Sequence, residues 1–152
     1  MHQKLVTPLI MWAIVIAGAA AIFFLAPNYW LIETGMLGFI VSTLAFINWL
    51  YFFFFALFEN QGAAGSVAGV RELTKTGVYS KVRHPIYFAD IALAWGIFLF
   101  LPMAKVLLAV VWLTLVLVFW AKLEEKALLE KFGKEYEEYK RAVPMLVPKL
   151  QH

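Results

Sequence analysis

Long apolar runs separated by short polar stretches dominate the pattern of this chain. Four such runs occupy residues 9–25, 34–58, 86–103 and 106–121, and Asp90 is the single charged residue within them. A helix that crosses a bilayer needs about 20 residues, within a range of roughly 17–25. The first two runs have this length and the last two reach it with flanking residues. The sequence therefore predicts an all-α integral membrane protein with four transmembrane helices.

Two prolines define the third of these helices. Pro85 favours the first turn of a helix, where its missing N–H costs nothing. Pro102 ends the same run and leaves room only for a tight turn at residues 101–105. The third and fourth predicted helices should therefore form a hairpin, with the start of the third beside the end of the fourth.

The first apolar run has an alternative interpretation as a cleaved signal peptide. Its n-region carries Lys4 as the only charge, and its small residues, Ala17 to Ala21, lie in the middle of the run. A signal peptide has a basic n-region and small residues at its end. A retained helix therefore fits this segment better.

The basic residues orient the chain in the membrane. Eleven of the 13 Lys and Arg residues lie on one side of the predicted spans: Arg71, Lys75, Lys81, Arg83, Lys122, Lys126, Lys131, Lys134, Lys140, Arg141 and Lys149. Cytoplasmic loops carry the excess of basic residues. We expect both termini on the cytoplasmic side, together with the loop at residues 61–85 and the tail at 122–152.

The composition agrees with a membrane protein and excludes several other kinds of protein and site. The chain has 152 residues and is 63% hydrophobic, against about 45–50% in soluble domains. It lacks cysteine and has three histidines, which excludes disulfides and thiolate zinc sites and disfavours a histidine metal centre. The net charge of +3 reflects orientation, and no motif for nucleic acid is present. We expect one domain, with helices at 1–60 and the hairpin at 86–121.

The segments around the hairpin have their own patterns. Residues 59–75 include three glycines and form a candidate lid over a binding site. In the tail an apolar stripe at helical spacing predicts an amphipathic helix, most simply one lying on the membrane surface: Leu128, Phe132, Tyr136 and Tyr139. Gly133 should bend or break this helix.

Two polar clusters are expected to meet at the open end of the hairpin. The first is the segment 77–87, with Tyr79, Arg83, His84 and Tyr87, and the second is Glu124-Glu125. Helix N-termini attract anions, and Arg83 and His84 add to that preference. Successive helical residues point about 100° apart, so one glutamate should face the site and the other solvent.

The ligand that matches this predicted site carries both a carboxylate and an ammonium group, as an amino acid does. Each residue also has a simpler explanation. Arg83, His84 and the glutamates could be solvated, and the tyrosines could anchor the chain at the membrane interface. Asp90 is harder to explain in this way, because ionisable residues at membrane depth are costly. It lies near the start of its helix, however, where the helix dipole favours an acid.

Two motifs in the C-terminal half resemble the isoprenylcysteine carboxyl methyltransferase family, whose pattern phospholipid methyltransferases share. The first contains Gly77, Tyr79, Arg83, His84, Pro85 and Tyr87; the second contains Glu124, Glu125, Leu128, Phe132, Gly133, Tyr136, Tyr139, Val143 and Pro144. The resemblance implies a membrane methyltransferase that uses S-adenosylmethionine and releases S-adenosylhomocysteine. The cofactor contacts that it implies are Leu73, Tyr79, His84, Pro85, Tyr87 and Glu124.

The acceptor of the methyl group is less defined by this resemblance. The family implies a lipophilic acceptor in the bilayer, with Arg83, Trp120 and Glu125 as weaker candidates for contacting it. Eukaryotic members carry an arginine for the substrate carboxylate where this chain has Trp120. Prenylcysteine, phosphatidylethanolamine, a small thiol and an isoprenoid acid all remain open, and no clear catalytic base stands out.

Two other functions compete with methyl transfer. Sterol reductases have a similar arginine–histidine segment and would bind NADPH. A non-catalytic membrane scaffold would use the polar motifs only as interfacial anchors.

Overall fold

The fold is a bundle of α-helices, as the sequence predicts. The computed structural model describes residues 7–60, 67 and 70–148. Its helices are α1 (Pro8–Leu25), α2 (Gly35–Glu59), α3 (Pro85–Phe100), α4 (Ala104–Phe132) and α5 (Lys134–Ala142), with a short 3-10 helix, η3 (Gly77–Ser80). Within the described residues there is no strand beyond one isolated bridge, between Trp30 and Met103.

Three of these helices are long and apolar enough to cross a membrane: α1, α2 and α4. Helix α3 is also apolar but has 16 residues, which is just short of the usual span. The structure therefore supports three of the four predicted spans by length and composition.

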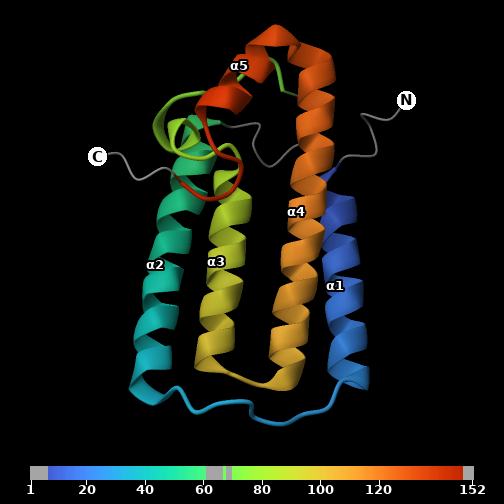
Figure 1. Ribbon diagram of the computed structural model, residues 1–152, viewed down its shortest axis with the longest axis vertical. Coiled ribbons are helices and arrows are strands. Elements are labelled where there is room, and N and C mark those ends of the chain that lie inside the picture. The colour runs from blue at the N-terminus through green and yellow to red at the C-terminus, as the bar shows by residue number, and fades with distance from the viewer. Residues whose placement is uncertain (1–6, 61–66, 68–69, 149–152) are drawn as a thin grey trace.

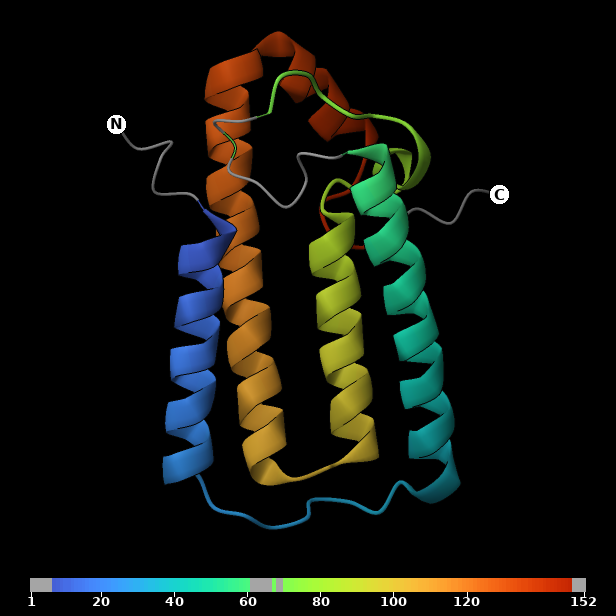
Figure 2. The same cartoon turned by 180° about the vertical axis from the view of Figure 1, so that it is seen from behind.

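The four long helices stand side by side in the order α2, α3, α4, α1 (Figures 1 and 2). Glycines allow α2 and α3 to approach closely. A Cβ at Gly38 would lie 2.2 Å from the Leu99 carbonyl oxygen, and one at Gly96 would lie 2.5 Å from Ala45 Cβ. Contacts this short do not occur, so only glycine permits this spacing of α2 and α3.

The hairpin of α3 and α4 forms where the prolines predict it. Pro85 occupies the first turn of α3. At the other end of the hairpin, the Leu31 N–H donates to the Pro102 carbonyl (2.8 Å) and the Ala104 N–H donates to the Tyr29 carbonyl (3.0 Å). These bonds fix the loop between α1 and α2 to the hairpin turn, leaving the opposite end of the bundle for the polar residues.

Helix α4 continues well past its apolar part, and Gly133 then separates it from α5 with φ of 54°. The predicted stripe continues onto α5, where Tyr136 and Tyr139 are buried in a cluster with Leu73, Leu128 and Phe132. The prediction that this stripe lies on a membrane surface is therefore wrong, because the protein itself covers it. Part of the candidate lid, residues 61–66 and 68–69, lies outside the described part of the chain.

Candidate active site

A cavity of about 900 Å³ lies at the end of the bundle where α3 begins and α4 leads into α5. Sites for small molecules commonly have volumes of 300–1,000 Å³. All six predicted cofactor contacts line this cavity: Leu73, Tyr79, His84, Pro85, Tyr87 and Glu124. The hairpin thus brings together both sequence motifs, as predicted.

Glu124 joins the two motifs directly. Its Oε1 accepts a hydrogen bond of 2.7 Å from the Tyr87 hydroxyl, and its Oε2 lies 3.6 Å from His84 Nδ1. The His84 and Tyr87 rings are stacked, with centroids 5.5 Å apart and planes 4° from parallel. The result is a largely buried carboxylate at the cavity wall, hydrogen-bonded to Tyr87 and with the His84 ring beside it.

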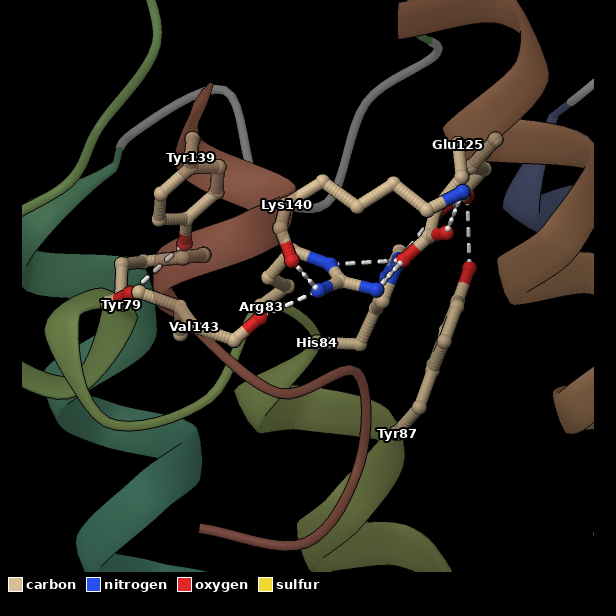
Figure 3. Close-up of polar contacts among 9 residues, drawn as sticks. Tyr79, Arg83, His84, Tyr87, Glu125, Tyr139, Lys140 and Val143 are labelled. Atoms are coloured by element: carbon tan, nitrogen blue, oxygen red, sulfur yellow. Dashed lines mark hydrogen bonds and ion pairs between the residues drawn. The ribbon is translucent and has the colours of Figure 1, made fainter. Parts of the chain in front are cut away.

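Glu125 is not among the residues that line the cavity; it pairs with Arg83 and lies 3.5 Å from His84 Nε2 (Figure 3). Its Oε1 lies 2.7 Å from Arg83 Nε and 2.5 Å from Arg83 Nη2, and its Oε2 lies 3.2 Å from Lys140 Nζ. The two paired side chains are only 6–7% exposed. The prediction that the second glutamate faces solvent is therefore wrong, because α5 and the chain that follows it cover this side of α4.

Arg83 also differs from its predicted role. Its remaining nitrogen, Nη1, donates to the carbonyls of Lys140 (2.9 Å) and Val143. Although Arg83 borders the cavity, its three nitrogens are thus engaged by the protein. The guanidinium acts as a structural anchor for the C-terminal segment, so the expected contact with an anionic ligand is not supported.

The C-terminal residues 139–146, which we call the clasp, hold the first motif in place. The Tyr139 hydroxyl donates to the Tyr79 carbonyl (2.6 Å). The Arg83 N–H donates to the Pro144 carbonyl (2.9 Å) and the His84 N–H to that of Met145 (3.2 Å). This function of the clasp was not predicted from the sequence, although Val143 and Pro144 belong to the family motif.

A second support that the sequence analysis missed is Glu59, at the end of α2. Its Oε2 accepts a hydrogen bond of 2.9 Å from the Val78 N–H. Gly77 has φ of 53°, and a Cβ there would lie 1.6 Å from Glu59 Oε1. Glycine is thus required where the first motif meets the glutamate.

The tyrosines of this region are uncharged. Burial raises the pKa of Tyr79, and the nearby Tyr139 raises it further. Burial likewise raises the pKa of Tyr136 and of Tyr139. Their hydroxyls therefore keep their protons at physiological pH.

Trp120, a weaker candidate for the acceptor, does not line the cavity. It is 5% exposed and belongs to the apolar cluster between α1 and α4, with Met11, Leu117 and Ala121. The structure therefore gives Trp120 a packing role. Asp90 does line the cavity, and its Oδ1 accepts a hydrogen bond of 2.8 Å from Trp49 Nε1.

Comparison with known proteins identifies the family. The phospholipid methyltransferase family profile matches residues 23–135. The chain belongs to the phospholipid methyltransferase family. This membership favours the methyltransferase interpretation over the reductase and scaffold alternatives.

Two curated relatives of this phospholipid methyltransferase family member are methanethiol S-methyltransferases. The protein from Bradyrhizobium diazoefficiens is 32% identical over 131 residues, which cover 78% of this chain and 45% of the relative. The protein from Pseudomonas deceptionensis is 27% identical over 135 residues, covering 80% and 50%. The chain thus spans about half the length of these relatives. No solved structure matches it.

Proposed function

We propose that this phospholipid methyltransferase family member transfers a methyl group from S-adenosylmethionine to an apolar thiol that enters from the bilayer. The observation that carries the proposal is the buried Glu124 carboxylate, hydrogen-bonded to Tyr87 beside His84 at the wall of the cavity. The names of the two relatives support a thiol as the acceptor.

The residues present fit the cofactor. Glu124 would pair with the ammonium of its methionine part, and the first N–H groups of α3, which have no partner within the helix, would face its carboxylate. Leu73 and Leu128 add apolar surface to the same cavity. When bound, S-adenosylmethionine supplies a methyl group made electrophilic by its sulfonium.

The contribution of the chain to this reaction is mainly positioning and exclusion of water. Clasp contacts with Tyr79, Arg83 and His84 fix the first motif. Glu59 fixes its start through Val78. With the cavity wall held from both sides, the acceptor and the methyl group can be aligned without rearrangement of the backbone.

The membrane topology follows from the same proposal. We infer that α3 is the fourth span, because it stands between α2 and α4 along its length (Figure 1). The excess of basic residues would place the cavity and α5 on the cytoplasmic side. The acceptor would enter between α1 and α2, where Leu9 and Trp12 line the cavity and are 83% and 37% exposed.

The charges of the cavity favour a thiol over a carboxylate acceptor. Among the described residues, the basic side chains that line it are Arg83, which Glu125 neutralises, and His84, which lies beside Glu124. Asp90 adds a further acid to the wall. An anionic acceptor would therefore lack a free cation, whereas an uncharged thiol needs none.

No group of three or more metal-binding side chains is found in the described part of the chain.

Two measurements test the proposed function. S-adenosylhomocysteine should raise the melting temperature of the purified protein, and NADPH should not. Incubation with methyl-labelled S-adenosylmethionine and 1-hexanethiol should yield the labelled thioether. Stabilisation by NADPH alone, or by neither compound, would overturn the assignment.

A further inference from the structure

Asp90 is the only aspartate of the chain and lies within the apolar helix α3. Its side chain lines the cavity. Ionisable groups at membrane depth are costly and usually mark a functional site. The proposed pairing of Glu124 with the cofactor does not involve Asp90, so the aspartate requires an explanation of its own.

The position of Asp90 places it on the acceptor side of the cavity. Tyr87 and Asp90 are three residues apart, so they share one face of α3. Tyr87 binds Glu124, and Asp90 lies about 4.5 Å farther along the helix axis, away from its start. It therefore lies deeper in the bundle than Tyr87, the residue that binds the carboxylate proposed to hold the cofactor.

The surroundings of Asp90 on α2 are aromatic. Trp49 donates to its Oδ1, and the Trp49 and Phe53 rings are stacked with centroids 4.8 Å apart. Both rings line the cavity. Among the described residues, no hydrogen bond or ion pair occupies Oδ2 of Asp90. One carboxylate oxygen is thus fixed by the indole, and the other is available for a ligand in an apolar part of the cavity.

We propose that Asp90 is the catalytic base that removes the proton of the acceptor thiol. This inference rests on the proposed methyl transfer. The acceptor sulfur forms a bond to the methyl carbon while the bond between that carbon and the cofactor sulfonium breaks, its electron pair remaining on the cofactor sulfur. The proton of the S–H group passes to Oδ2 of Asp90 and from there to solvent.

The chemistry of the site favours a thiol as the group that Asp90 serves. A carboxylate acceptor needs no base and would be repelled by the aspartate. A protonated amine would have to enter beside a cofactor that already carries a sulfonium, and like charges at short range in a low dielectric are unfavourable. An uncharged thiol avoids both costs and gains its nucleophilic form only when a base accepts its proton.

A purely structural role is the alternative, in which Asp90 only tethers α3 to Trp49. Asp90→Asn separates the two roles, because the amide oxygen still accepts the indole hydrogen bond but cannot take up a proton at neutral pH. Trp49→Phe makes the complementary change, removing the tether and leaving the carboxylate. Glu33→Gln is a control at an exposed acid of the loop between α1 and α2.

The test compares methyl transfer to 1-hexanethiol and to thiophenol, which is largely ionised at neutral pH. With 1-hexanethiol, the rate of methyl transfer by Asp90→Asn should be about 10²-fold or more below that of wild type. With thiophenol its rate should equal or exceed that of wild type, because this acceptor needs no base and its thiolate is no longer repelled by the aspartate. Trp49→Phe should lose less than Asp90→Asn with 1-hexanethiol, and Glu33→Gln should behave as wild type.

Binding provides readouts independent of turnover. Asp90→Asn should keep the wild-type affinity for S-adenosylhomocysteine and the wild-type melting temperature. In the presence of S-adenosylhomocysteine, it should bind hexanoate about tenfold more tightly than wild type, because the repelling charge is gone.

The possible failures are distinguishable. A wild-type protein that does not bind S-adenosylhomocysteine contradicts the proposed function itself. A wild-type protein that binds it but methylates neither thiol overturns the role of Asp90, as does an Asp90→Asn variant that keeps its rate with 1-hexanethiol. Equal losses with both thiols in Asp90→Asn would show a structural role and also overturn it.

Discussion

The Tyr87 hydroxyl donates a hydrogen bond of 2.7 Å to Glu124 Oε1, joining the first turns of α3 to α4 across 37 positions of the sequence. The next residue, Glu125, forms a buried ion pair with Arg83. Two adjacent glutamates therefore have different tasks: Glu124 presents a carboxylate to the cavity, and Glu125 fastens the first motif to α4.

The Tyr87 hydrogen bond should affect binding more than folding. Tyr87→Phe keeps the ring stacked on His84 but removes the donor to Glu124. Without this donor the Glu124 carboxylate is no longer oriented toward the ligand, so we expect weaker binding of S-adenosylhomocysteine by roughly tenfold, or about 1.4 kcal/mol. Isothermal titration calorimetry of the variant measures this loss. Unchanged affinity would show that Tyr87 does not orient the carboxylate.

The ion pair of Arg83 and Glu125 should affect folding instead. Glu125→Gln leaves a buried guanidinium without its counter-charge, and breaking a buried pair in this way costs about 3–5 kcal/mol. We expect a clear fall in the melting temperature of the protein in detergent. Glu124→Gln is the matched control on the neighbouring residue and should change the melting temperature much less. Equal effects of the two substitutions would refute the division of tasks.

The clasp should depend on the buried bond between Tyr139 and the backbone of Tyr79. Tyr139→Phe leaves the Tyr79 carbonyl without its 2.6 Å partner, and an unsatisfied buried polar group costs about 1–3 kcal/mol. Thermal unfolding should show this destabilisation, whereas Tyr29→Phe, at an exposed tyrosine, should have little effect. A stable Tyr139→Phe variant would mean that the clasp does not need this bond.

Two glycines with almost the same backbone conformation provide a test of the Glu59 contact. Gly35 and Gly77 have φ of 50° and 53°, but a Cβ would meet nothing within 4 Å at Gly35 and would collide with the Glu59 carboxylate at Gly77. Both alanine variants should be less stable than wild type by about 1–2 kcal/mol, because the left-handed conformation is unfavourable for a residue with a Cβ. Gly77→Ala should lose more stability, together with affinity for S-adenosylhomocysteine. Equal losses of stability in the two variants would show that the Glu59 contact does not matter at Gly77.

The sequence predicted the helices of this protein and their boundaries well, because local signals in the sequence define them. Pro85, Pro102 and Gly133 mark helix boundaries that the structure confirms. The long apolar runs predicted the helices, and the hairpin brought Tyr87 to Glu124. These features follow from backbone restrictions and helical geometry, which act over a few residues.

Helix geometry alone did not predict which glutamate faces the cavity, although the family resemblance named Glu124. Neither predicted that Glu125 is buried. Helical spacing separates Glu124 from Glu125 by about 100° but does not say what covers each side. That depends on the clasp returning to Arg83 and His84, through contacts such as Arg83 with Pro144. Trp120 shows the same limit, since only the packing of α1 against α4 reveals its burial.

Calorimetric titration of the wild-type protein and of Glu124→Gln with S-adenosylhomocysteine shows whether Glu124 binds the cofactor. We expect saturable binding by wild type, and binding weaker by about tenfold or more in the variant, because a charge-assisted contact is lost. The melting temperature of the unliganded variant should stay near that of wild type. Absence of binding by wild type, or equal affinity in a folded Glu124→Gln variant, would contradict the account.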